Sequence, residues 1–307
     1  MIRTAIIAAM PGELKPLVRG WRHEKRNRVD IWRWSYGTGE WVAACAGAGQ
    51  NAATRALAEV EKDGPVASVV SVGWAGSLSG VYKPGEAYRV AGVIDTLTGE
   101  RFRVARIAES SMAGQATVLK RHGLSRAAEP HNQGSALAAE GTVATQKPLP
   151  QGLKPKDISS PQIGTAKAVP FQSSSSAQSA AAQHDVWLAT SPRVADAAEK
   201  QRLASTYKAG LVDMEAAAIA RLAGMRGISF QCIKGVSDGV DDQLPDFNPF
   251  LAREGQFQTF RFTLFALFHP GYWSALKQMG ENSKKASQSI AKSVFDLLDP
   301  QGSIYKK

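Results

Sequence analysis

Residues 66–72 (VASVVSV) form the feature that most limits what this chain can fold into. The run is continuously apolar or small rather than alternating, and it is rich in β-branched valine, which is typical of a strand covered on both faces. Strands of this kind belong mainly to α/β proteins, in which helices lie on both sides of a sheet. The run ends in the sequence GWAG at residues 73–76, where the glycines indicate a turn.

The rest of the chain repeats this alternation of apolar strands and helices. Residues 5–9 predict a first buried strand, and a Pro-Gly turn then leads into a short helix over residues 13–18. The further strands are predicted at residues 31–36, 41–46, 88–95 and 228–235, and the further helices after residues 47–51, around 195–207 and from 215 to 223. We therefore expect a three-layer α/β/α sandwich with a central mixed sheet.

The domain organisation follows from two changes in composition. Residues 110–184 are rich in Ser, Ala, Gln, Gly and Pro and poor in large apolar residues, so they cannot bury enough surface to offset their ordering entropy. We expect one domain over residues 1–268, interrupted by this flexible surface insertion, and a helical C-terminal tail over residues 269–307. The apolar residues of the tail recur at helical spacing, which favours a helix packed on the domain or on a second subunit over one lying on a membrane.

Composition excludes several classes of protein. The 307 residues are 44% hydrophobic and 21% charged, as in ordinary globular proteins. The net charge of +10 is spread along the chain without a basic block, so we expect no nucleic-acid partner. The sequence lacks a recognisable signal peptide and a long apolar span, which predicts a cytoplasmic protein. The five histidines are scattered, and the two cysteines predict buried free thiols, so no metal site is expected.

Three carboxylates occupy positions at which an α/β sheet binds ligands. Glu13 follows the first strand, Glu215 begins a helix, and Asp238 ends the strand after that helix. Ligands bind outside the carboxyl ends of such strands, so the three acids could converge on one crevice and stabilise a cationic, oxocarbenium-like transition state. Each acid also has a structural interpretation, because acidic residues favour helix starts and cap turns.

Five sequence blocks, in the same order along the chain, resemble motifs of the 5′-methylthioadenosine/S-adenosylhomocysteine nucleosidases of the nucleoside phosphorylase/nucleosidase superfamily. They are IIAAMPGE at residues 6–13, GAGQNAA at 47–53, VGWAG at 72–76, VDMEA at 212–216 and VSD at 236–238. This resemblance implies a phosphorylase-like fold and cleavage of the N-glycosidic bond of a purine nucleoside. It implies no cofactor, and it implies a homodimer or higher homo-oligomer.

The resemblance also implies a role for each matching residue. Glu13 would activate water, Asp238 would protonate N7 of the leaving purine, and Ser237 would help to hold Asp238. Glu215 would accept hydrogen bonds from the ribose hydroxyls, with Met214 packed against the sugar. The remaining residues expected at the substrate lie in the glycine-rich segments: Gly49, Trp74, Ala75 and Gly76. Protonation of the base avoids the release of a purine anion, which is a poor leaving group, and carboxylates near the sugar stabilise the positive charge that it gains.

Alternatives remain open at this point. Hexameric purine nucleoside phosphorylases also resemble the chain, but they carry an arginine where Ser71 stands here, which favours hydrolysis over the use of phosphate as co-substrate. Trp74 replaces a small serine of the nucleosidases, and residues 189–193 (ATSPR) replace their base-stacking phenylalanine. The tail and the DME segment also resemble hopanoid-associated phosphorylases, which act on an adenosyl-lipid. A non-catalytic nucleoside-binding module is the remaining alternative.

Overall fold

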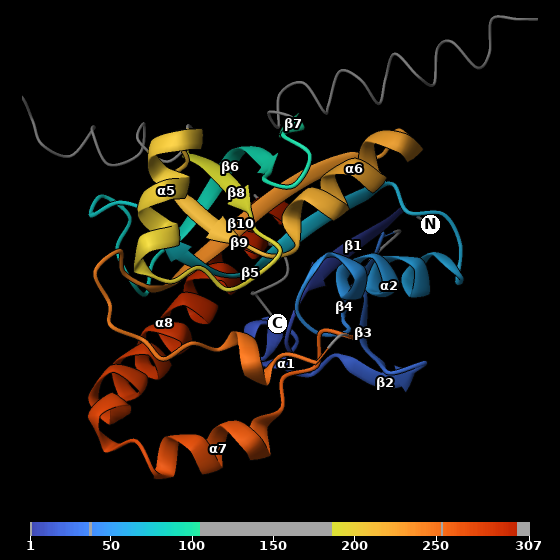
Figure 1. The fold of residues 1–307 in the computed structure, drawn as a ribbon. Helices are drawn as coiled ribbons and strands as arrows, with labels where there is room; N and C mark the ends of the chain where they lie inside the picture. The colour runs from blue at the N-terminus through green and yellow to red at the C-terminus, as the bar shows by residue number, and fades with distance from the viewer. Residues whose placement is uncertain (1, 37–38, 105–185, 253, 300–307) are drawn as a thin grey trace, which may run out of the picture.

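The computed structural model describes residues 2–36, 39–104, 186–252 and 254–299 (Figure 1). The insertion expected at about 110–184 lies outside these residues, as do the last residues of the expected tail. The strands are β1 (Ile2–Ala8), β2 (Arg22–Arg26), β3 (Val29–Tyr36), β4 (Gly39–Cys45), β5 (Ser68–Ser77), β6 (Ala87–Asp95), β7 (Arg101–Arg103), β8 (Val186–Thr190), β9 (Leu211–Asp213) and β10 (Ser229–Asp238). The helices are α1 (Pro11–Leu14), α2 (Gln50–Glu61), α5 (Ala197–Tyr207), α6 (Ala216–Arg226), α7 (Thr259–Leu267) and α8 (Trp273–Leu298), with 3-10 turns η1 (Asn248–Phe250) and η2 (Pro270–Tyr272).

The strands form one mixed 10-stranded sheet in the order β10-β6-β8-β9-β5-β1-β4-β3-β2, and β7 pairs with β6 at the side. Because β10 also pairs with β5, the strands β5, β9, β8, β6 and β10 close into a ring, from which β1, β4, β3 and β2 extend. Strands β1, β5 and β10 run parallel to one another, so their carboxyl ends lie at the same edge. That edge is where the sequence places Glu13 and Asp238.

Helices cover both faces of the sheet, which confirms the predicted three-layer architecture. Adjacent strand residues alternate between two apolar cores: Ile7 packs in the core beneath α2 and α6, and Ile6 packs in the core beneath α1 and α8. The same alternation holds in β5, where Val69 faces the first core and Val70 the second. The valine-rich run is therefore buried on both sides, as its sequence predicts.

The helix expected after Pro270 is α8, and it packs on the domain. Its residues Ala286, Ile290 and Val294 are fully buried against the sheet. Gly235 of β10 permits the close approach, because a Cβ atom at this position would lie 2.9 Å from the Ala286 Cβ and 2.9 Å from the Ile290 Cδ1. None of the described helices is long and apolar enough to span a membrane.

Some element bounds differ from the sequence-based expectation. β5 does not end before residues 73–76 but continues through them, because its pairing with β10 extends to Gly76. Likewise β10 includes Val236, Ser237 and Asp238. The first helix is shorter than expected and spans only Pro11–Leu14. Cys45 and Cys232 are buried free thiols, as predicted.

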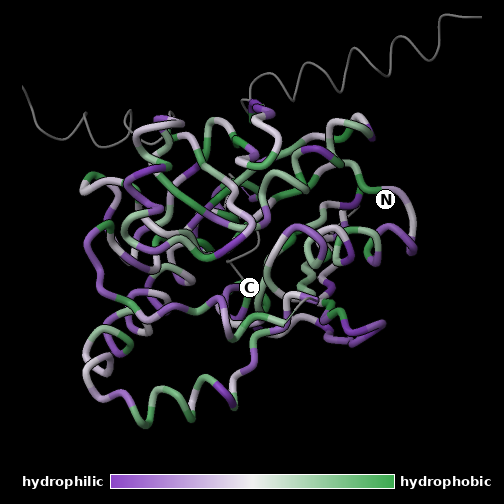
Figure 2. The backbone as a smooth tube through the Cα atoms, in the orientation of Figure 1, coloured by the Kyte–Doolittle hydropathy of each residue, from purple (hydrophilic) through white to green (hydrophobic). Residues whose placement is uncertain are grey.

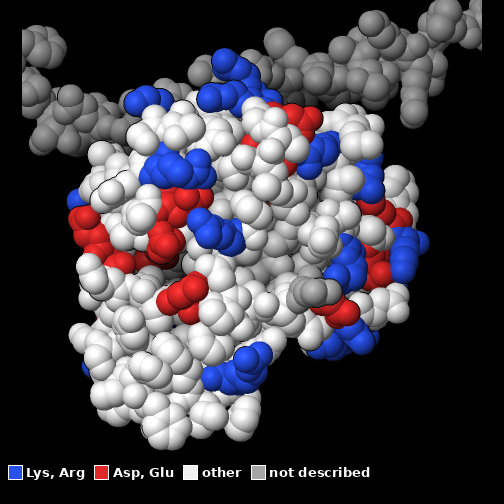
Figure 3. All heavy atoms as spheres, in the orientation of Figure 1, with Lys and Arg blue, Asp and Glu red and all other residues white. Residues whose placement is uncertain are grey.

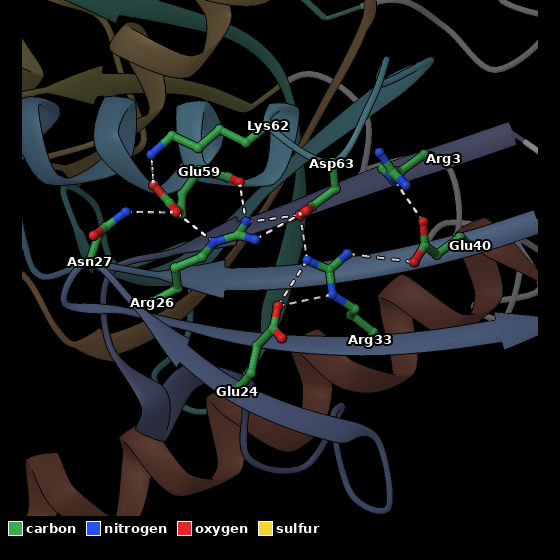
Figure 4. A network of polar contacts seen from close by, with 9 residues as sticks. All are labelled: Arg3, Glu24, Arg26, Asn27, Arg33, Glu40, Glu59, Lys62 and Asp63. Atoms are coloured by element: carbon green, nitrogen blue, oxygen red, sulfur yellow. Dashed lines mark hydrogen bonds and ion pairs between the residues drawn. The ribbon is translucent and has the colours of Figure 1, made fainter.

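Strand β2 (RHEKR) was not predicted, because an edge strand exposed to solvent carries no apolar pattern (Figure 2). A network of ion pairs attaches this edge to α2 and to the neighbouring strands (Figure 4). Arg26 contacts Glu59 at 2.6 Å and Asp63 at 2.9 Å, and Arg33 reaches both Asp63 and Glu24. Hydrogen bonds from Arg26 and then from Arg33 keep the pKa of Asp63 well below its ordinary value of 3.8.

Candidate active site

A cavity of about 1190 Å³ lies at the carboxyl edge of β1, β5 and β10. Among the predicted site residues, Glu13, Met214, Glu215, Ser237, Asp238, Trp74, Ala75 and Gly76 all line it. The structure therefore brings together three carboxylates that are far apart in the sequence. The opposite wall of the cavity is formed by α7, α8 and the loop that follows β10.

Glu13 is buried and held by three backbone amides. Its Oε2 accepts hydrogen bonds from the amides of Ala9 and Met10, each at 2.8 Å, and its Oε1 accepts one from the amide of Trp74 at 2.8 Å. Burial raises the pKa of Glu13 above its ordinary value of 4.5, although the backbone hydrogen bonds and the nearby Lys234 oppose the shift.

Gly73 gives Glu13 the room that this position needs. Its backbone φ is +139°, a conformation that favours glycine, and a Cβ atom would lie 2.9 Å from Glu13 Oε1. The glycine of the VGWAG block is thus explained by the carboxylate beside it rather than by a turn, since β5 continues past this residue.

Glu215 lies at the N-terminus of α6 and also faces the cavity. Its Oε1 accepts a hydrogen bond from the amide of Gly49 at 2.7 Å, so the GAGQNAA block at residues 47–53 holds this carboxylate. Gly49 itself does not line the cavity, although it was expected at the substrate. Burial, together with the negative charge of Asp213, raises the pKa of Glu215 to about 7. A pKa of about 7 places the titration of Glu215 near neutral pH.

A buried ion pair between Lys234 and Asp213 lies next to these acids, and the sequence analysis missed it. Lys234 Nζ is 2.8 Å from Asp213 Oδ2, and both side chains are inaccessible to solvent. Asp213 also accepts hydrogen bonds from Thr190 Oγ1 at 2.7 Å and from the amide of Ala216 at 2.9 Å. Although burial opposes it, the charge of Asp213 raises the pKa of Lys234 above its ordinary 10.5. Lys234 therefore stays cationic and partly balances the acids.

Asp238 lies at the other side of the cavity with two partners. Ser237 Oγ donates to Asp238 Oδ1 at 2.6 Å, and Lys200 Nζ contacts Asp238 Oδ2. Lys200 is 3% exposed and also donates to the carbonyl of Gly239 at 2.6 Å. No sequence signal pointed to Lys200, because a lysine on a polar helix such as α5 is expected to be exposed to solvent.

Trp74, which was expected only to contact the substrate, also makes hydrogen bonds that hold the site together. Its backbone amide binds Glu13, while its indole Nε1 donates to Ser287 Oγ at 2.9 Å and to the carbonyl of Ser283 at 3.1 Å. The side chain therefore connects the cavity wall to α8. Among the residues that the structure describes, no cluster of three or more His, Cys, Asp or Glu side chains could hold a metal ion.

Comparisons with known proteins identify the family and the fold of the chain. A family model described as the phosphorylase superfamily matches residues 3–261. A 5′-methylthioadenosine/S-adenosylhomocysteine nucleosidase of Helicobacter pylori has a TM-score of 0.57 at 13% identity, covering 97% of this chain and 98% of that one. The futalosine hydrolase of H. pylori has a TM-score of 0.58 at 13% identity, with 97% and 98% covered. A Campylobacter jejuni 5′-methylthioadenosine/S-adenosylhomocysteine nucleosidase has a TM-score of 0.56 at 11% identity, with 98% and 100% covered.

No curated protein sequence is significantly similar to the chain. At such low identity the likeness to solved structures shows a shared fold, whereas the family model spans most of the sequence, including Glu13, Glu215 and Asp238. The fold expected from the sequence is thereby confirmed, and so is the resemblance to this superfamily. The chain belongs to the phosphorylase superfamily of nucleoside phosphorylases and nucleosidases.

Proposed function

We propose that this protein hydrolyses the N-glycosidic bond of a purine nucleoside. The observation that carries the proposal is the position of Glu13, a buried carboxylate fixed by three amides in a cavity that Glu215 and Asp238 also line. The reaction requires that water be activated, that positive charge on the sugar be stabilised and that the base be protonated, and one of these acids can perform each task.

Glu13 suits the activation of one water molecule. A carboxylate has about four acceptor positions, and three of those of Glu13 are filled by backbone amides, which leaves about one for a water. Burial raises the pKa of Glu13 above its ordinary value, which makes the carboxylate a stronger base than an exposed glutamate. Ser71, in place of the arginine of hexameric phosphorylases, supports water rather than phosphate as the nucleophile.

Glu215 would act on the sugar and Asp238 on the purine base, which the N-glycosidic bond joins. Glu215, when ionised, accepts hydrogen bonds from the ribose hydroxyls, and its charge favours the cationic sugar of the transition state. Asp238 transfers a proton to N7 of the leaving purine, while Ser237 and Lys200 fix the orientation of its carboxyl group. Lys200 is a positioning residue in this scheme, because it acts through Asp238.

The most direct candidate substrates are 5′-methylthioadenosine and S-adenosylhomocysteine, which the named nucleosidases act on. One observation favours a second candidate, a nucleoside with a larger apolar substituent such as an adenosyl-lipid. The cavity continues from the three acids to an apolar wall made by Phe257, Phe262, Leu276 and Met279. A bare ribose would leave that wall uncovered.

A nucleoside panel in phosphate-free buffer tests the proposal. Wild-type protein should release adenine from at least one adenosyl substrate, as measured by chromatography. Asp238→Asn and Glu13→Gln should each lower kcat by about 10²-fold or more, since positioned acid–base catalysis contributes about 10²–10⁴. Glu215→Gln should lower both kcat and kcat/KM, because the neutral amide binds the hydroxyls more weakly as positive charge develops.

Glu61→Gln is the matched control, since Glu61 is a surface carboxylate of α2 outside the cavity lining. Its turnover should equal that of the wild type. Three folded cavity variants with wild-type turnover would show that the acids are only structural. Nucleoside binding without release of adenine by the wild type would instead identify a binding module.

A further inference from the structure

Residues 259–276 form an apolar lobe that projects from the domain. It consists of α7, η2 and the first turn of α8, and it lies at the bottom of the view in Figure 1. No residue of α7 is buried, although the helix is mostly apolar (Figure 2). An apolar helix without a buried residue marks a surface that is built to meet something else.

The exposed apolar residues of this protein gather on the lobe. Nine large apolar side chains are exposed among the described residues, and five of them lie here, between 48% and 80% exposed: Phe260, Leu264, Leu267, Phe268 and Trp273. Phe260, Leu264 and Leu267 recur at helical spacing along one stripe of α7, and Phe268 continues the stripe at the C-cap of the helix. They therefore form one continuous patch rather than scattered single residues.

The inward face of α7 shows that this orientation is fixed. Phe262 and Phe265 pack on Phe250 with ring centroids 5.3 and 5.2 Å apart, and Phe262 also packs on Phe247 and Phe257, each at 5.3 Å. This aromatic cluster holds one face of the helix against the preceding segment, residues 247–257. The outward apolar stripe is therefore exposed because the opposite face of α7 is packed, and not because the helix lacks contacts.

Charge identifies what the lobe meets. Residues 255–280 contain no Asp or Glu, whereas Arg261 and Lys277 are exposed beside the apolar stripe; Glu281, Lys284 and Lys285 follow on α8. The lobe accordingly shows white and blue on its visible face (Figure 3). Trp273 is an aromatic residue of the kind enriched where membranes meet water. Apolar side chains flanked by cations, without carboxylates, match the surface of an anionic bilayer.

We propose that the apolar lobe docks this protein on the surface of an anionic lipid bilayer. The contact is peripheral, because α7 has 9 residues and cannot cross the membrane. A symmetric contact with a second copy fits the lobe less well, since it would bring the cations of both lobes to one interface without lobe carboxylates to pair with them. Phe262 and Leu276 also line the cavity, so docking brings one cavity wall to the lipid surface.

Vesicle sedimentation tests the docking without any assay of activity. The full chain is mixed with vesicles of phosphatidylcholine alone or with phosphatidylglycerol added, and the pelleted fraction is measured at low and high salt. Wild-type protein should pellet with the anionic vesicles and less so at high salt. The double variant Phe260→Ser/Phe268→Ser should lower the partition coefficient at least about tenfold, because both side chains insert.

Two further variants keep the outcome interpretable. Met225→Ser, at an exposed apolar position of α6 outside the lobe, should pellet as the wild type does. Arg261→Gln/Lys277→Gln should reduce binding to anionic vesicles only, with an unchanged Tm. Wild-type protein that stays in the supernatant, or a Phe260/Phe268 variant that pellets undiminished, would overturn the proposal. A wild-type dimer that this variant converts to a monomer, with no vesicle binding, would assign the lobe to a second copy.

Discussion

Replacing Glu215 by glutamine should stabilise the protein, and by more at high pH than at low pH. The carboxyl group of Glu215 has its pKa raised from 4.5 to about 7, mainly by burial and by the charge of Asp213. The folded protein therefore keeps a proton that the unfolded chain releases, and stability falls as the pH rises from 4.5 to about 7. At about 1.4 kcal/mol per pKa unit, ionised Glu215 costs the folded state about 3 kcal/mol above that range.

Glutamine keeps the shape of the side chain and its carbonyl can accept the hydrogen bond from Gly49, so the substitution removes this cost and loses only the longer bond that the amide of Met214 donates to Glu215 Oε2 at 3.3 Å. Urea unfolding should show Glu215→Gln more stable than the wild type by about 3 kcal/mol at about pH 8, and by less than about 1 kcal/mol at about pH 5. Glu59→Gln should behave oppositely, because hydrogen bonds from Lys62 and Arg26 outweigh burial and lower the pKa of Glu59. Equal differences at both pH values, or a wild type that is the more stable form at about pH 8, would refute the reasoning.

Three other substitutions test the surroundings of the site. Lys234→Met should leave Asp213 buried without its cation and destabilise the protein by about 3–5 kcal/mol in urea unfolding; restoration of stability by Asp213→Asn in the same chain would confirm the pairing. Gly73→Ala should lower the Tm, because alanine is strained at a φ of +139°, and should also displace Glu13 and lower the kcat of the folded protein by about 10²-fold; an unchanged kcat would contradict the packing given above. Asp63→Asn should cost about 1 kcal/mol at neutral pH, a difference that shrinks as the pH falls below 3.8, and a pH-independent difference would argue against the network.

Much of the fold was predictable because apolar periodicity is a local signal. The valine-rich residues 66–72 predicted a strand buried on both faces, and Val69 and Val70 do face opposite cores. Edge strand β2 carries no such signal, since its RHEKR sequence is polar throughout and its pairing depends on distant ion pairs. The continuation of β5 through Gly73 was also hidden, because glycine usually marks a turn and here makes room for Glu13.

The residues of the candidate site also include some that the sequence predicts and some that it does not. Glu13 and Asp238 could be placed in advance, because Glu13 follows β1 and Asp238 ends β10, and both strands end at the same edge of the sheet. Lys234 and Lys200 could not, since only tertiary packing turns these lysines inward to meet Asp213 and Asp238. The indole of Trp74 likewise reaches α8, which lies 209 residues further along the chain at Ser283.

The nucleophile is the centre of the proposed function, and one measurement identifies it. Wild-type protein is incubated with 5′-methylthioadenosine over a series of phosphate concentrations that begins at zero, and the sugar product is identified by mass spectrometry. Glu13 at the buried end of the cavity predicts an adenine release rate that is independent of phosphate, with free methylthioribose formed in equal amount. A rate that is zero without phosphate and rises with its concentration, together with a sugar 1-phosphate as product, would contradict hydrolysis.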